Sequence, residues 1–288
     1  MSLRAGESRG MRTIAFNTIV EHTKRLCIGE SQILDGSMVK RFQSARQTQS
    51  SPPGREVQQL VDNAQIAREE GYPICQDIAH AVFFVELGQD IRIEGGALTD
   101  AINKGVAEAC REGYPRYSIV ADPLKRKDTG DISAVLTLQL VRGDRLRLSF
   151  LAKGAGCDNM SGFKMLTPAD GVNGVKDFVL DTVRAASGKP CPPVVVGVGM
   201  GGTFDLCCML AEKALFRGLG AGHPDPFYAQ LETELLDEIN RLGTGPKRLD
   251  GRTTTVAVHI ETLPCHIASL PVAVNMNCHA HGHRSVVL

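Results

Sequence analysis

Five of the nine cysteines stand beside prolines or polar residues, where a thiol is well placed to act as a ligand. They lie in the segments PICQD, GAGCDN, KPCPP, LPCHI and NMNCHAHGH, as Cys75, Cys157, Cys191, Cys265 and Cys278. A neighbouring proline fixes the backbone and removes a donor, which suits a rigid ligand loop. The absence of a CxxC pair excludes a zinc ribbon and a thioredoxin-type motif. Widely spaced single cysteines that converge on folding suit an iron–sulfur cluster better.

The C-terminal histidines offer a different metal centre. Cys265-His266 and the alternating His279, His281 and His283 could form a zinc or transition-metal module if these histidines share one face of a strand. The simpler expectation is a tail of solvated histidines. The remaining cysteines lie in helical patterns and are expected to serve packing; they are Cys27, Cys110, Cys207 and Cys208.

The segment CPPVVVGVGMGGTFD carries a GxGxxG spacing, at Gly197, Gly199 and Gly202, after an apolar run typical of a strand. A glycine turn followed by a helix near Thr203 would direct backbone N–H groups at an anion. A dinucleotide site also needs a second strand with an acidic end about 20 residues later, where this sequence has a helix and a glycine loop. Two interpretations stay open: an anion cradle, or glycines that let a helix pack closely on a strand.

Bulk composition favours an ordinary globular protein. Of 288 residues 43% are apolar, and 32 basic residues balance 32 acidic ones, so no global charge favours nucleic acid or an anionic membrane. No apolar run approaches the roughly 18 residues of a membrane span, and no signal-peptide pattern opens the chain. We therefore expect a cytoplasmic protein with reduced thiols. Residues 1–11 are interpreted as a leader or cloning scar, and residues 12–288 as one domain.

Helical and strand patterns alternate along the chain, which predicts an α/β or α+β fold of mixed sheets flanked by helices. Two β-rich runs around Arg142-Gly143-Asp144 predict a hairpin over 133–153. Ser44 to Arg55 is predicted to be a loop, and GLGAGHPDP a hinge without a domain break. Helices are predicted at 12–43, 56–70, 98–111, 171–187, 203–217 and 226–242, and strands at 81–87 and 253–261, followed by a mixed tail from Leu270.

Five segments in order give the chain a specific resemblance. They are GYPICQDIAHAVFFVELG, RYSIVADPLKRKDTGD, FLAKGAGCDNMSGFKMLTPADG, CPPVVVGVGMGGTFDLCCMLAEKALFR and IASLPVAVNMNC. Together they resemble the iron–sulfur hydro-lyases, that is, class I fumarase and L(+)-tartrate dehydratase, in their α chain or N-terminal domain. The resemblance covers roughly residues 12–280. It implies the fold of the N-terminal domain of class I fumarases.

The resemblance also implies a [4Fe-4S] cluster held by Cys75, Cys191 and Cys278, which are 116 and 87 residues apart. Three thiolates on a cubane leave one iron open, and that iron can act as a Lewis acid on the hydroxyl group of a 2-hydroxy dicarboxylate. The implied reaction is the reversible loss of water from malate or L-tartrate. The glycines of the CPP segment would then shape the wall of the dicarboxylate site.

By the same resemblance, Gln76 and Asp77 would contact the substrate's hydroxyl or carboxylate group and serve catalysis. Arg116 would hold a carboxylate in a bidentate fork. Lys153, Gly154 and Gly156 of the KGAG turn would bind substrate, the glycines through backbone N–H groups. These roles belong to the family and are expectations for this chain.

Several positions depart from the family's pattern. CQDTG becomes CQDIA, NTGDN becomes DTGDI, and GPQGLGG becomes GPKRLDG; the changed residues are Ile78, Ala79, Asp128, Ile132, Lys247, Arg248 and Asp250. KGGGSEN becomes KGAGCDN, which puts Cys157 where a serine is usual. The ligand positions are intact. The alternative is therefore a metal-binding or regulatory homologue that kept the fold and lost turnover.

The resemblance implies a partner as well. In the two-chain enzymes of the family a separate β subunit carries the base and further carboxylate contacts. This chain ends ten residues after Cys278. We expect it to need a β subunit in an αβ or α2β2 assembly.

Overall fold

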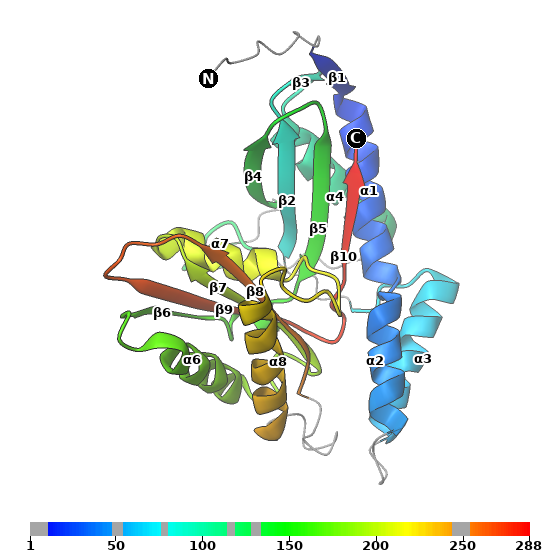
Figure 1. The fold of residues 1–288 in the computed structure, drawn as a ribbon. Coiled ribbons are helices and arrows are strands. Elements are labelled where there is room, and N and C mark those ends of the chain that lie inside the picture. Colours follow the sequence, from blue (N-terminus) through cyan, green and yellow to red (C-terminus); the bar gives the residue numbers. More distant parts are fainter. Residues whose placement is uncertain (1–10, 48–53, 76–79, 114–118, 128–133, 244–253) are drawn as a thin grey trace.

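The computed structural model describes residues 11–47, 54–75, 80–113, 119–127, 134–243 and 254–288, and shows two four-stranded sheets flanked by helices (Figure 1). This arrangement confirms the expected mixed class of sheets and helices. No helix in the described ranges is both long and apolar enough to span a bilayer.

The first sheet has the strand order β10-β5-β2-β4. Its elements are β2 (His80–Gly88), β4 (Val135–Val141), β5 (Leu146–Lys153) and β10 (His283–Val287). Apolar side chains from one face pack against α1 (Phe16–Gln32) and α4 (Leu98–Gly113). The rings of Phe83 and Phe150 meet in this core with centroids 5.0 Å apart. The first sheet is thus covered by a helix pair on one side.

The second sheet has the order β6-β9-β7-β8 and carries helices on both faces. Its strands are β6 (Gly162–Leu166), β7 (Val194–Gly201), β8 (Thr255–Leu263) and β9 (Leu270–Asn277). Side chains of α6 (Gly171–Ala186) and α8 (Pro226–Arg241) form the core on one face. On the other face lies α7 (Phe204–Ala214). β7 is buried along its whole length, as expected of a strand covered on both sides.

The N-terminal part contains more elements than its sequence pattern predicts. A single helical stretch was expected at 12–43, but the structure has three elements there: β1 (Arg12–Ala15), α1 and α2 (Gly36–Gln47). α2 extends into the expected loop, which ends where α3 (Gly54–Glu70) begins. β3 (Ile91–Glu94) pairs with β1, and a short α5 (Ala155–Asp158) follows β5. The other expected helices and strands are present with small shifts at their ends.

The hairpin expected at 133–153 is wrong. Both strands form, as β4 and β5, but β2 lies between them and pairs with each of them. The turn passes around the end of β2, where Gly88 N–H donates to Arg145 O and Asp90 N–H to Gly143 O. β2 is apolar on both faces, so the central position of the sheet buries more of it than an edge would.

The first two glycines of the GxGxxG spacing serve helix packing. Gly197 and Gly199 lie within β7 and not in a turn. A Cβ atom on Gly197 would overlap the carbonyl oxygen of Ala211, and one on Gly199 would overlap that of Cys207. The absence of side chains lets the backbone of α7 lie directly on the strand. Of the two interpretations left by the sequence, close packing is the one that the structure supports.

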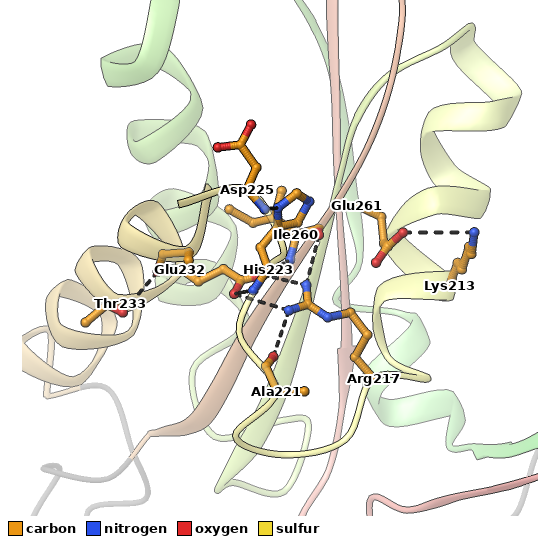
Figure 2. Close-up of polar contacts among 10 residues, drawn as sticks. Lys213, Arg217, Ala221, His223, Asp225, Glu232, Thr233, Ile260 and Glu261 are labelled. Carbon is orange, nitrogen blue, oxygen red and sulfur yellow. Dashed lines mark hydrogen bonds and ion pairs between the residues drawn. The ribbon is translucent and has the colours of Figure 1, made fainter. Parts of the chain in front are cut away.

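A buried ion pair ties the glycine loop after α7 to the edge of the second sheet (Figure 2). The carboxylate of Glu232 in α8 accepts a hydrogen bond from Arg217 Nη1 at 2.6 Å, from Ile260 N–H at 2.8 Å and from His223 N–H at 3.0 Å. Arg217 also donates to the carbonyl oxygens of Ala221 and Ile260. The segment expected to be a hinge is therefore held at Ala221 and His223 by one carboxylate–guanidinium pair.

Replacing Glu232 with glutamine is expected to lower the free energy of unfolding by about 3–5 kcal/mol, because Arg217 then keeps a buried charge without its counterion. Equilibrium unfolding in urea measures this loss. The exposed pair between Arg184 and Asp181 gives a matched control, in which Asp181→Asn should change stability by less than about 1 kcal/mol. Equal effects of the two variants would contradict the argument.

Candidate metal centre

Three cysteines from distant parts of the chain lie where the two sheets meet. Cys75 follows α3 and precedes β2, Cys191 precedes β7, and Cys278 follows β9 on the connection to β10. The backbone at Cys191 has a φ of 54°, in the left-handed region, so the KPCPP segment turns sharply there. Each thiol is thus held at the end of a strand or in a short connection beside one.

The three thiols share one neighbourhood. Cys75 and Cys278 line the same cavity, together with Gly154. Burial raises the pKa of the Cys191 thiol, and the charges of Cys278 and Cys75 raise it further, so both groups act on it electrostatically. Cys191 O also accepts hydrogen bonds from the backbone N–H and the ring of His279, next to Cys278. The cavity itself has a volume of about 30 Å³, roughly that of one water molecule. The thiols, and not an enclosed pocket, therefore indicate a metal centre here.

Cys157 adds a fourth thiol to this neighbourhood. It is buried, with 2% of its surface exposed, and its Sγ donates to the carbonyl oxygen of Pro190 at 3.4 Å. It also hydrogen-bonds with the thiol of Cys278, and this contact lowers the pKa of Cys157 and raises that of Cys278. The sequence placed Cys157 among the five candidate thiols but not among the three ligands.

Lys153 is a buried cation beside the thiols. Its ammonium group donates to the side-chain oxygen of Asn275 and to the carbonyl oxygen of Met276, and lies 3.7 Å from Asp158. Burial lowers its pKa, while the negative charge of Asp158 opposes that shift. Lys153 therefore ties the turn that follows β5 to β9. Its contact with substrate stays a prediction.

The two glycines of the KGAG turn differ in their surroundings. Gly154 precedes α5 and lines the cavity between Cys75 and Cys278. A Cβ atom on Gly156 would lie 3.4 Å from the carbonyl oxygen of Lys189, so this glycine allows the turn to approach the KPCPP segment. Only Gly154 therefore lies at the cavity. Substrate binding by either glycine stays a prediction.

Glu30 is a residue of this cavity that the sequence did not point to. It lies near the end of α1 with 5% of its surface exposed, and Arg284 Nε is 3.4 Å from its carboxylate. Burial raises its pKa to about 8, although Arg284 opposes the shift. A glutamate in a helical pattern carries no signal of this position, because Arg284 meets it only through the fold.

The remaining predicted site residues, Gln76, Asp77 and Arg116, lie outside the described residues. The same holds for seven of the positions that depart from the family's pattern: Ile78, Ala79, Asp128, Ile132, Lys247, Arg248 and Asp250. Their roles stay predictions.

Of the tail histidines His281 is buried, contrary to the expectation of solvated side chains, while His279 and His283 are partly exposed. His281 is 2% exposed and its Nδ1 lies 3.1 Å from Asn277 Nδ2, while His283 lies in β10. The tail is ordered because β10 pairs with β5 at the edge of the first sheet, where its residues stay partly exposed. In the described part of the chain, no three His, Cys, Asp or Glu side chains are grouped closely enough to hold a single metal ion. A zinc module therefore finds no support there, whereas the ligands of a cubane stand farther apart than those of one ion.

Comparisons with known proteins cover nearly the whole chain. The family model described as fumarate hydratase (Fumerase) matches residues 20–287. A putative L(+)-tartrate dehydratase subunit alpha from Methanocaldococcus jannaschii is 41% identical over 228 residues, which are 77% of this chain and 80% of that protein. The L(+)-tartrate dehydratase subunit alpha of Escherichia coli O157:H7 is 31% identical over 279 residues, 95% of this chain and 92% of that protein. That of Escherichia coli K12 is 30% identical over the same shares.

Proposed function

This chain belongs to the fumarate hydratase family and is a hydro-lyase, and we propose that it is the α subunit of a [4Fe-4S]-dependent enzyme that removes water reversibly from a 2-hydroxy dicarboxylate. The proposed substrates are of the malate/fumarate or L-tartrate/oxaloacetate type. The observation that supports the proposed cluster is that Cys75, Cys191 and Cys278, from three distant segments, lie in one neighbourhood between the two sheets.

The residues fit the proposed cofactor in number and in kind. Thiolates are the ligands that iron–sulfur clusters take in proteins, and three of them on a cubane leave one iron without a protein ligand. Bound there, the cluster would supply a Lewis acid for the hydroxyl group that leaves as water. Two connections beside the proposed ligands are fixed by hydrogen bonds: His279 N–H donates to Cys191 O, and Cys278 N–H donates to Asn277 Oδ1. These bonds orient the ligand loops before any cofactor is present.

The other groups of the site have proposed roles around the substrate. Arg116 would hold one carboxylate in a bidentate fork, and Gln76 and Asp77, directly after Cys75, would contact the leaving hydroxyl group or a carboxylate. Backbone N–H groups of Gly154 and Gly156 would bind a carboxylate oxygen. Lys153 would add positive charge behind them, through its position beside Cys278.

A β subunit would complete the site. The relatives are named as alpha subunits, which supports a partner chain, and a base must remove the proton next to the second carboxylate of the substrate. No residue of this chain is proposed to act as that base. We propose an αβ or α2β2 assembly in which the partner supplies it.

Activity should therefore depend on assembly. After anaerobic reconstitution with iron and sulfide, the chain alone is expected to turn over fumarate, malate and tartrate at least about 100-fold more slowly than the chain purified with its β subunit, since the proposed partner would supply the general base. Steady-state kinetics with each dicarboxylate measure the difference. Full activity of the isolated chain would contradict the need for a partner. An assembly that binds the cluster but turns over no dicarboxylate would favour a regulatory homologue.

A further inference from the structure

Cys157 is the thiol of this neighbourhood that the proposed function does not use. It follows the KGAG turn, in α5, and two contacts fix its position. Its Sγ donates to the carbonyl oxygen of Pro190, the residue before Cys191, and its backbone N–H donates to Gly154 O. The side chain is 2% exposed, so it is held against the protein and does not rotate freely in solvent.

The partner of Cys157 is Cys278. The two thiols lie within hydrogen-bonding reach of each other. They are attached to different sheets: Cys157 lies in α5, which follows β5 of the first sheet, and Cys278 directly follows β9 of the second. The ion pair of Lys153 with Asp158, and the bonds of Lys153 to Asn275 and Met276, hold the two segments side by side. Proximity of the two sulfurs is therefore built into the joint between the sheets.

Other buried thiols have different surroundings. Cys207 donates to Gly199 O inside the packed contact between α7 and β7, where its backbone also meets the strand. Cys27 lies in the core between α1 and α4. Cys157 and Cys278, by contrast, have each other as hydrogen-bonding partners.

We propose that Cys157 and Cys278 form a reversible disulfide when the cysteines hold no metal group, with hydrogen peroxide as the oxidant. The two thiols lose two electrons and two protons as the S–S bond forms, and peroxide is reduced to two molecules of water. A dithiol reductant reverses the step by exchange. The disulfide occupies Cys278, so the oxidised protein cannot take up a cluster until the bond is reduced. This inference concerns the cysteines alone and goes beyond the proposed reaction.

Mass spectrometry of the full-length chain tests the disulfide. Metal is removed with a chelator under a reducing agent, the reductant is exchanged away, and hydrogen peroxide is added before free thiols are alkylated. We expect a cross-linked peptide that joins Cys157 to Cys278, and a roughly tenfold fall in the alkylation of Cys278 that dithiothreitol restores. Peptides are sequenced by fragmentation, because proteolysis after lysine and arginine leaves Cys265 and Cys278 in one peptide.

Two variants make the result specific. Cys157→Ser should abolish the cross-link and keep Cys278 open to alkylation after peroxide, whereas Cys191→Ser should leave the cross-link intact. The inference is overturned if Cys278 is protected equally in the wild type and in Cys157→Ser, or if it joins Cys75 or Cys191 instead. Iron and sulfide contents after anaerobic reconstitution are scored separately. If the chain forms the disulfide but never takes up iron and sulfide, the proposed cofactor is wrong and the inferred disulfide is still supported.

Discussion

Replacing Cys278 with alanine in the assembled enzyme is expected to abolish retention of iron and sulfide and to lower kcat by more than about 100-fold, beyond the 10–100-fold that loss of an outer-shell partner of a metal costs. Cys278 is the proposed ligand that lies on the crossing from β9 to β10, beside both other thiols. The variant would leave two thiolates for the cluster, because the ligand on the connection between the sheets is lost. Iron and sulfide analysis and the visible absorbance of anaerobically reconstituted protein measure retention.

A matched variant separates loss of a ligand from loss of any thiol. Cys208 is exposed on α7, next to the buried Cys207. Cys208→Ala should keep the iron and sulfide content and the kcat of the wild type. If Cys278→Ala retained the cluster and Cys208→Ala lost it, the assignment of the ligands would be wrong.

Gly199→Ala is expected to destabilise the fold by about 3 kcal/mol or more, or to prevent folding. The added Cβ atom would overlap the carbonyl oxygen of Cys207 and lie 2.9 Å from Cβ of Leu210. The overlapped group is backbone on a buried helix, so neither a rotamer change nor a small side-chain shift relieves the clash. α7 would have to move away from β7 and open the core around Cys207 and Ala211.

The measurement is equilibrium unfolding of the full chain in urea. Gly188→Ala is the control, because no atom lies within 4 Å of its added Cβ, and it should change stability by less than about 0.5 kcal/mol. A stable Gly199→Ala protein with an unchanged unfolding midpoint would show that the helix does not depend on direct contact with the strand.

Helical and strand periodicity predicted most elements of this fold, because each is amphipathic or uniformly apolar over its own length. Pairing was harder to predict. β4 and β5 are adjacent in sequence and look like a hairpin, yet β2 lies between them. Which strand takes the central place depends on its burial on both faces, and that is decided by helices such as α1 and α4 that come from elsewhere in the chain.

The sequence pointed to the thiols of the candidate site, and their role as ligands stays a prediction. Cys75, Cys191 and Cys278 each lie in a polar or proline-containing segment, and the ordered segments assigned them as ligands. Glu30 and the contact between Cys157 and Cys278 were not predictable. Both depend on pairs of residues more than 100 positions apart, which only the fold brings together.

The crossing at Cys278 bears on how such a protein matures. Cys75 precedes β2 of the first sheet, and Cys191 precedes β7 of the second. Cys278 lies in the connection from β9 of the second sheet to β10 of the first. The three sulfurs come together through segments of both sheets. We therefore expect insertion of the proposed cofactor to follow the assembly of both layers, as a late step in biogenesis.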